Sequence, residues 1–291
     1  MLRHSPSSPE PSPLEHRLRD RGRALARGGL SPSTLVFDLD ETLWDWASPV
    51  LRQPMLVLEH VEYIFVRRPL LWLLQGLAEG QRDALMLWTS GYGYRIDRIC
   101  EHVPELGRLI GLVPGQESAS LSNVFTRPDY LTALQRDPLL VPDPNGRWLA
   151  HKFPGMPTVG GKPAVDAARV LVDDKEENCR RFVAAGEGRS AIWLRNTPRV
   201  WRNNFTWARL PTPPPLQWAE GVADALEAIT GGRVELYPVD PTPSAYPNPS
   251  ARIRIPHERL WRDWIAPGRA VEAILERRRG GGPRHTVPAR S

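Results

Sequence analysis

Lysine and cysteine are scarce in this chain of 291 residues. Of its 38 basic residues only Lys152, Lys162 and Lys175 are lysines, so a lysine near a functional motif is conspicuous. The two cysteines, Cys100 and Cys179, are too few for a disulfide framework and do not have the spacing of a metal site. This usage indicates two reduced thiols in a reducing compartment.

Long apolar runs are also missing. No run approaches the roughly 18 residues that a membrane span requires, and the start of the chain lacks the apolar core of a signal peptide. We therefore expect a cytoplasmic protein with no membrane partner. The hydrophobic content of 41% is ordinary for a folded core.

Charge and proline divide the chain into three parts. Residues 1–30 are rich in proline and arginine, which predicts a disordered tail, with a short helix in its arginine-rich part as an alternative. We expect a folded domain over residues 31–230 and a proline- and arginine-rich, disordered extension over residues 231–291. Basic tails can bind nucleic acid, although most are simply solvated.

Apolar runs alternate with helical patterns from residue 34 onward. The predicted strands are residues 35–38, 62–66, 84–89, 147–152, 169–173 and 191–195, and the predicted helices are residues 70–77, 94–102, 176–185 and 218–229. This alternation is typical of βαβ units. We therefore expect an α/β fold with a parallel sheet between layers of helices.

The most informative stretch has the sequence DLDET at residues 38–42, directly after the apolar run at residues 35–37. Two carboxylates at the carboxyl end of a buried strand lie where open α/β sheets bind ligands. The side chain of Asp38 and the backbone carbonyl of Asp40 can both reach one hard cation, which leaves the Asp40 side chain for proton transfer. An acidic turn without function is the alternative, because aspartate favours turns.

Two further predicted strands end in polar side chains. One ends in Thr89 and Ser90, and the other in Asp173 and Asp174. The carboxyl ends of parallel strands meet at one edge of a sheet, so we expect these side chains beside Asp38. The alternatives are a threonine that caps the next helix and an acidic helix N-terminus favoured by the helix dipole.

The order of these strand ends resembles the haloacid dehalogenase (HAD) superfamily, whose first motif is an apolar strand followed by D-x-D-x-T. Residues 35–103 are similar to the small C-terminal-domain phosphatases, through DLDETL, an Arg-Pro pair before a helix and a strand that ends in Thr-Ser. Magnesium-dependent phosphatases are similar through DLD, TLW and the paired aspartates at residues 173 and 174. The resemblance covers roughly half of the chain and implies a HAD-type, Rossmann-like fold without a large cap.

The resemblance also implies a role for each motif residue. Asp38 would be the nucleophile that forms an aspartyl-phosphate. Asp40 would protonate the leaving oxygen and later deprotonate water, with a pKa raised by burial and by Asp38. Thr42 would fix the loop through side-chain hydrogen bonds to the backbone, and Thr89 would bind a phosphate oxygen. The implied magnesium ligands are Asp38, Asp40, Asp173 and Asp174.

A cation is expected beside the phosphoryl group. Lys152 ends a predicted strand well upstream of Asp173, which favours it for this position. Lys162 lies nearer to Asp173, follows two glycines and remains the alternative. Lys175 is expected to pair with neighbouring acids.

We therefore expect a Mg²⁺-dependent hydrolase of phosphomonoesters. An open site suits a phosphoprotein substrate, and a small phosphorylated metabolite is the other substrate class. Two alternative functions stay open. One is removal of a terminal phosphate from nucleic acid, which only the pI of about 9.5 and the arginine-rich tails suggest. The other is a non-enzymatic HAD-fold module that binds a partner.

Overall fold

The computed structural model describes residues 12–47, 61–89, 93–126, 167–184, 186–195, 216–232, 234–243 and 252–256. Six strands form a parallel sheet in the order β5-β4-β1-β6-β7-β9. They are β1 (Leu35–Phe37), β4 (Met86–Trp88), β5 (Val124–Phe125), β6 (Val170–Asp173), β7 (Ser190–Leu194) and β9 (Leu236–Val239). The predicted α/β class with a parallel sheet is confirmed.

The central strands bury side chains on both faces of this sheet. Along β1, Leu35 and Phe37 lie in one apolar cluster and Val36 lies in the other. The neighbouring β6 alternates in the same way, with Leu171 beside Val36. Strands covered on both faces appear in the sequence as continuous apolar runs, which is why the pattern predicted them.

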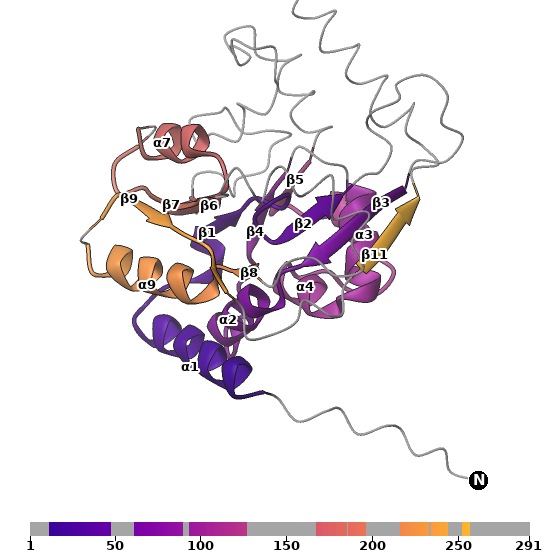
Figure 1. Ribbon diagram of the computed structural model, residues 1–291, viewed down its shortest axis with the longest axis horizontal. Helices are drawn as coiled ribbons and strands as arrows, with labels where there is room; N and C mark the ends of the chain where they lie inside the picture. The colour runs from indigo at the N-terminus through magenta and orange to yellow at the C-terminus, as the bar shows by residue number, and fades with distance from the viewer. Residues whose placement is uncertain are drawn as a thin grey trace, which may run out of the picture.

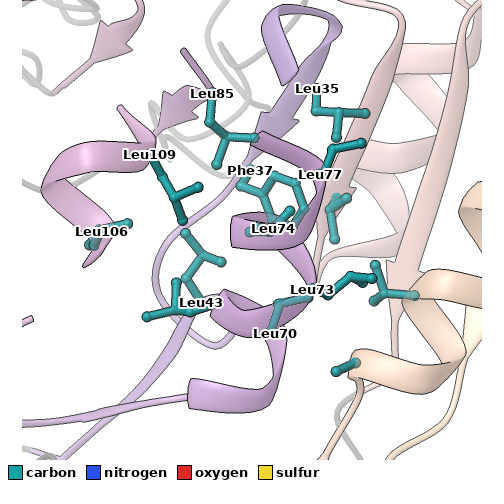
Figure 2. Close-up of a cluster of buried hydrophobic side chains, with 14 of the residues drawn as sticks. Leu35, Phe37, Leu43, Leu70, Leu73, Leu74, Leu77, Leu85, Leu106 and Leu109 are labelled. Carbon is teal, nitrogen blue, oxygen red and sulfur yellow. The ribbon is translucent and has the colours of Figure 1, made fainter. Parts of the chain in front are cut away.

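Helices cover both faces of the sheet (Figure 1). α7 (Glu176–Ala184) lies on one face, where its Phe182 packs in the cluster that contains Val36. α2 (Arg68–Ala78) and α9 (Ala219–Thr230) lie on the other face. Figure 2 shows leucines of α2, including Leu74 and Leu77, beside Phe37 of β1.

The remaining elements are short. α3 (Gly93–His102) and α4 (Pro104–Leu109) follow β4, and two 3₁₀ helices, η1 (Pro32–Thr34) and η2 (Ser118–Ser120), precede β1 and β5. β2 (Trp44–Ala47), β3 (Val61–Val66) and β11 (Arg252–Pro256) form an antiparallel sheet in the order β11-β3-β2, and β8 (Leu216–Gln217) pairs with β10 (Thr242–Pro243). Both cysteines are buried free thiols. No helix in the described part of the chain combines the length and apolarity that a bilayer crossing needs.

The arginine-rich part of the N-terminal segment forms a helix, which was the alternative to the predicted disordered tail. α1 (Pro13–Arg27) begins after Ser12, whose Oγ accepts a hydrogen bond from the N–H of Glu15 at 3.2 Å. Its buried residues, Leu14, Leu18 and Leu25, recur at helical spacing and belong to the main apolar cluster. α1 is therefore part of the folded unit, and it lies beside α2 and α9 (Figure 1).

Two glycines let α1 and α2 touch through their backbones. A Cβ atom at Gly22 would lie 2.2 Å from the carbonyl oxygen of Leu73, and one at Gly76 would lie 2.1 Å from that of Arg19. Neither position can therefore hold a side chain at this helix separation.

Ion pairs join α1 to α9. Arg21 contacts Asp224 at 2.6 Å and Glu227 at 2.8 Å, and Arg17 contacts Glu220 at 2.7 Å. The arginines of this segment had suggested a solvated tail, but two of them form ion pairs with acidic residues of α9.

The C-terminal boundary also differs from the prediction, which placed the end of the domain near residue 230. β9 pairs with β7 as an edge strand of the main sheet, and β11 pairs with β3. Each of these strands satisfies the backbone hydrogen-bonding groups of a strand that would otherwise lie at an edge. The folded part therefore extends beyond the predicted boundary.

Candidate active site at the sheet edge

Four of the predicted site residues, Asp38, Thr89, Asp173 and Asp174, lie at the carboxyl ends of β1, β4 and β6. Within the main sheet the chain proceeds from β1 to β4 and β5 on one side, and continues through β6, β7 and β9 on the other. The carboxyl ends of β1 and β6 therefore flank the topological switch point, where open α/β sheets bind ligands. Asp38 follows β1, Thr89 follows β4, and Asp173 ends β6.

Asp38, Asp173 and Asp174 form a carboxylate cluster, in which one oxygen from each lies within 4.8 Å of the others. Asp38 is 3% exposed, Asp173 is fully buried, and Asp174 is half-buried. Like charges this close repel one another in a site with little water. Three carboxylate oxygens suit a hard divalent cation such as Mg²⁺, so the donor set fits the predicted metal.

Backbone and side-chain groups hold this cluster in place. The N–H of Asp38 donates to the carbonyl of Val172 in β6 at 3.0 Å. The two carboxylate oxygens of Asp173 accept hydrogen bonds from the N–H of Lys175 at 2.8 Å and from Nδ2 of Asn178 at 3.0 Å. Asp173 thus contacts the first turn of α7 while it faces the cluster. An aspartate at a helix N-terminus, which was the alternative interpretation of the sequence, is therefore compatible with a metal site.

Thr89 is buried at the end of β4. Its N–H donates to the carbonyl of Phe125 at 3.0 Å, which continues the β4–β5 pairing and fixes the residue on the strand next to β1. Ser90, the neighbouring hydroxyl, lies outside the described residues.

The loop after β1 is a compact turn held by its backbone. The N–H groups of Thr42, Leu43 and Trp44 converge on the carbonyl of Leu39 at distances of 2.9 to 3.2 Å. Glu41 has a φ of 64°, in the left-handed region that usually favours glycine. Such a residue persists only where its surroundings fix it, and the turn therefore holds Asp40 in a defined place.

Thr42 contributes to this loop in a way that differs from the prediction. Its hydroxyl is buried and has no hydrogen-bond partner in the described part of the chain. Its backbone carbonyl instead accepts a hydrogen bond from Nη1 of Arg67 at 3.1 Å. The Arg67 guanidinium also lies 3.7 Å from the ring centroid of Trp218, so a buried cation–π contact anchors the loop to the start of α9.

Asp40 does not join the carboxylate cluster through its side chain. Its Oδ2 and Oδ1 accept hydrogen bonds from Nη1 and Nη2 of Arg95 at 3.0 and 2.9 Å, and Oδ1 also accepts one from Nε1 of Trp44 at 2.8 Å. The Arg95 side chain is 3% exposed and that of Asp40 is 23% exposed. The prediction for Asp40 considered burial and Asp38, but not this guanidinium, which stabilises the carboxylate ion.

Sequence reasoning missed Arg95, Arg67 and Asn178. Arginine is so common in this chain that residue type gave no signal, but Arg95 lies in the first turn of the helix that follows Thr89, a position that points to the site. Lys152 and Lys162 both lie outside the described residues, so the choice between them stays a prediction.

No protein-family model, curated protein or solved structure matches this chain. The carboxylate cluster, Thr89 and the pair of Asp40 with Arg95 are therefore the features that indicate a function.

Proposed function

We propose that this protein is a Mg²⁺-dependent phosphatase of the HAD type, which hydrolyses a phosphomonoester through an aspartyl-phosphate at Asp38. One observation carries the proposal. The carboxylate cluster of Asp38, Asp173 and Asp174 lies at the topological switch point, and a further carboxylate, Asp40, follows two residues after Asp38. A phosphoprotein is the substrate class that the sequence favours.

Asp38 supplies the nucleophilic oxygen in this proposal. Its carboxylate attacks phosphorus in line with the leaving oxygen, so the bond from phosphorus to the leaving oxygen breaks as the bond to Asp38 forms. A carboxylate suffices because phosphoryl transfer has a loose transition state, in which positioning and charge stabilisation matter most. Thr89, on the neighbouring strand end, donates its hydroxyl to a phosphoryl oxygen.

Asp40 carries the proton in both half-reactions. It gives a proton to the leaving oxygen in the first step. In the second step it takes a proton from the water that attacks phosphorus, and the bond from phosphorus to the Asp38 oxygen breaks, which releases inorganic phosphate and returns Asp38 to the carboxylate. A residue with this task must lie near Asp38 without binding the metal through its own side chain, and Arg95 and Trp44 hold the Asp40 carboxylate in that way. The guanidinium favours the carboxylate ion, which suits the base of the second step, whereas the acid of the first step must be protonated against this preference.

Asp38, Asp173 and Asp174 would hold Mg²⁺, together with the predicted carbonyl ligand of Asp40. When bound, the ion offsets negative charge on the phosphoryl group and the carboxylates. The hydrogen bond from Asn178 keeps the Asp173 carboxylate in a fixed orientation toward the cluster. A metal ligand that is already oriented loses less conformational freedom when the ion binds.

Hydrolysis of p-nitrophenyl phosphate by the purified protein tests the proposal. We expect turnover in Mg²⁺, loss of turnover in EDTA, and at least about a hundredfold loss in Asp38→Asn, because an amide is a far poorer nucleophile and ligand. Asp224→Asn is the matched control, since it makes the same chemical change at an exposed carboxylate of α9. An Asp38→Asn variant with the wild-type rate would disprove the nucleophile.

A further inference from the structure

We propose that Arg95 is a positioning residue, which fixes the carboxylate of Asp40 for proton transfer and keeps it out of the carboxylate cluster. The inference rests on the proposed function, because it assigns Arg95 a role in the same reaction. It follows from the contacts of Asp40, from the rigidity of the helix that carries Arg95, and from the crowding of acids at this edge of the sheet.

The contacts leave the Asp40 carboxylate little freedom to rotate. Arg95 bonds both of its oxygens at 3.0 and 2.9 Å, and Trp44 bonds one of them at 2.8 Å. A bidentate guanidinium fixes both the position and the plane of a carboxylate. Because the two donors come from α3 and β2, the carboxylate is held from two elements.

Arg95 itself projects from a firmly held helix turn. Ile96 and Ile99 of α3 are fully buried in the main core. The first turn of α3 is tied to η2, because the Ser118 N–H donates to Asp97 at 2.8 Å and the Ser118 hydroxyl donates to the carbonyl of Gly93 at 3.0 Å. A guanidinium carried by such a turn can set the position of its partner to within a fraction of an ångström.

Positioning matters here because four carboxylates share one sheet edge. Three of them form the cluster, and a metal ion there would attract the Asp40 side chain as a further ligand. Proton transfer needs a separation of about 2.6–3.2 Å between heavy atoms, and a misplacement of about 1 Å can lower a rate roughly a hundredfold. The Arg95 guanidinium separates the two roles, because it holds the Asp40 side chain in position for proton transfer and away from the metal ion, which the other three carboxylates would bind.

A comparison of leaving groups separates this role from a merely structural one. Departure of p-nitrophenolate needs little protonation, whereas departure of phenolate from phenyl phosphate depends more on a proton donor. We expect Arg95→Gln to lose at least about ten times more rate on phenyl phosphate than on p-nitrophenyl phosphate, as Asp40→Asn does. The double variant should show no further change in this ratio, because both substitutions remove the same function.

Two more variants complete the experiment. Arg95→Lys keeps the charge but loses the planar fork, and we expect the same shifted ratio as for Arg95→Gln. Arg98→Gln is the matched control, since Arg98 lies on the same helix with 54% of its side chain exposed, and the ratio should stay at the wild-type value. The ratio of two rates in one preparation does not depend on the folded fraction. If Arg95→Gln does not fold, Arg95→Lys carries the comparison.

Equal losses on both esters, additivity with Asp40→Asn, or rescue by lysine would overturn the assignment of Arg95. In each of these cases the wild-type protein is still active, so the proposed function stands. A wild-type protein that hydrolyses neither ester in Mg²⁺ would instead overturn the proposed function, and the role of Arg95 with it.

Discussion

Replacing Gly22 by alanine tests how closely α1 packs on α2. In an open helix interior this change stabilises a protein by about 0.5–1 kcal/mol, because glycine loses more backbone freedom on folding. The new Cβ would lie 2.2 Å from the carbonyl oxygen of Leu73 and 2.5 Å from the nitrogen of Leu77, and neither backbone atom can rotate away. α1 would have to move by roughly 1 Å to restore a normal contact. We therefore expect the free energy of unfolding to fall by about 1–3 kcal/mol.

Gly107→Ala in α4 is the matched control. A Cβ atom there would meet side-chain atoms of Cys100 and Leu112 at 3.6 to 3.9 Å, which are ordinary contact distances. We expect this variant to be neutral or more stable by up to about 1 kcal/mol. Urea unfolding followed by circular dichroism measures both variants. A Gly22→Ala protein as stable as Gly107→Ala would refute the backbone contact between the two helices.

Three further predictions concern the metal, a thiol and the lysines. Mg²⁺ should raise the melting temperature of the wild-type protein, whereas Asp174→Asn should melt higher without metal and respond less to Mg²⁺. The reason is that like charges within 4.8 Å of one another repel by about 3–4 kcal/mol per pair at an effective dielectric constant of about 20. An unchanged response would argue against the cluster. Burial, with a smaller effect of Asp97, raises the pKa of Cys100 to about 12. Iodoacetamide at neutral pH should therefore not label this thiol in the folded protein, and rapid labelling seen by mass spectrometry would contradict its burial. Lys152→Ala should lower turnover by orders of magnitude and Lys162→Ala should cost little, and the reverse result would assign the cation to Lys162.

Four strands of the main sheet and the shared edge at which they end followed from the sequence, whereas β9 and the two-residue β5 did not. β1, β4, β6 and β7 are buried on both faces, so their apolar runs were continuous and their ends were marked by polar residues. Parallel pairing then required Asp38, Thr89 and Asp173 to share one edge. The helices of the main fold were predicted for the related reason that each presents an apolar stripe to the sheet.

Other features depend on contacts between distant parts of the chain. α1 was expected only as an alternative, because the proline and arginine content of the segment favoured a disordered tail, although the spacing of Leu14, Leu18 and Leu25 was the available signal for a packed helix. Asp40 and Arg95 are separated by 55 residues and meet only through the packing of α3. β9 and β11 are short edge strands that contain proline, and such strands gain their stability from a partner rather than from their own pattern.

Trapping the covalent intermediate is the most direct test of the proposed chemistry. The protein is mixed with p-nitrophenyl phosphate and Mg²⁺, quenched in acid, and digested for mass spectrometry of the peptide that contains residue 38. We predict a phosphoryl group on Asp38 in the wild-type protein and none in Asp38→Asn. A phosphoryl group on any other residue, or continued turnover by Asp38→Asn, would contradict the mechanism.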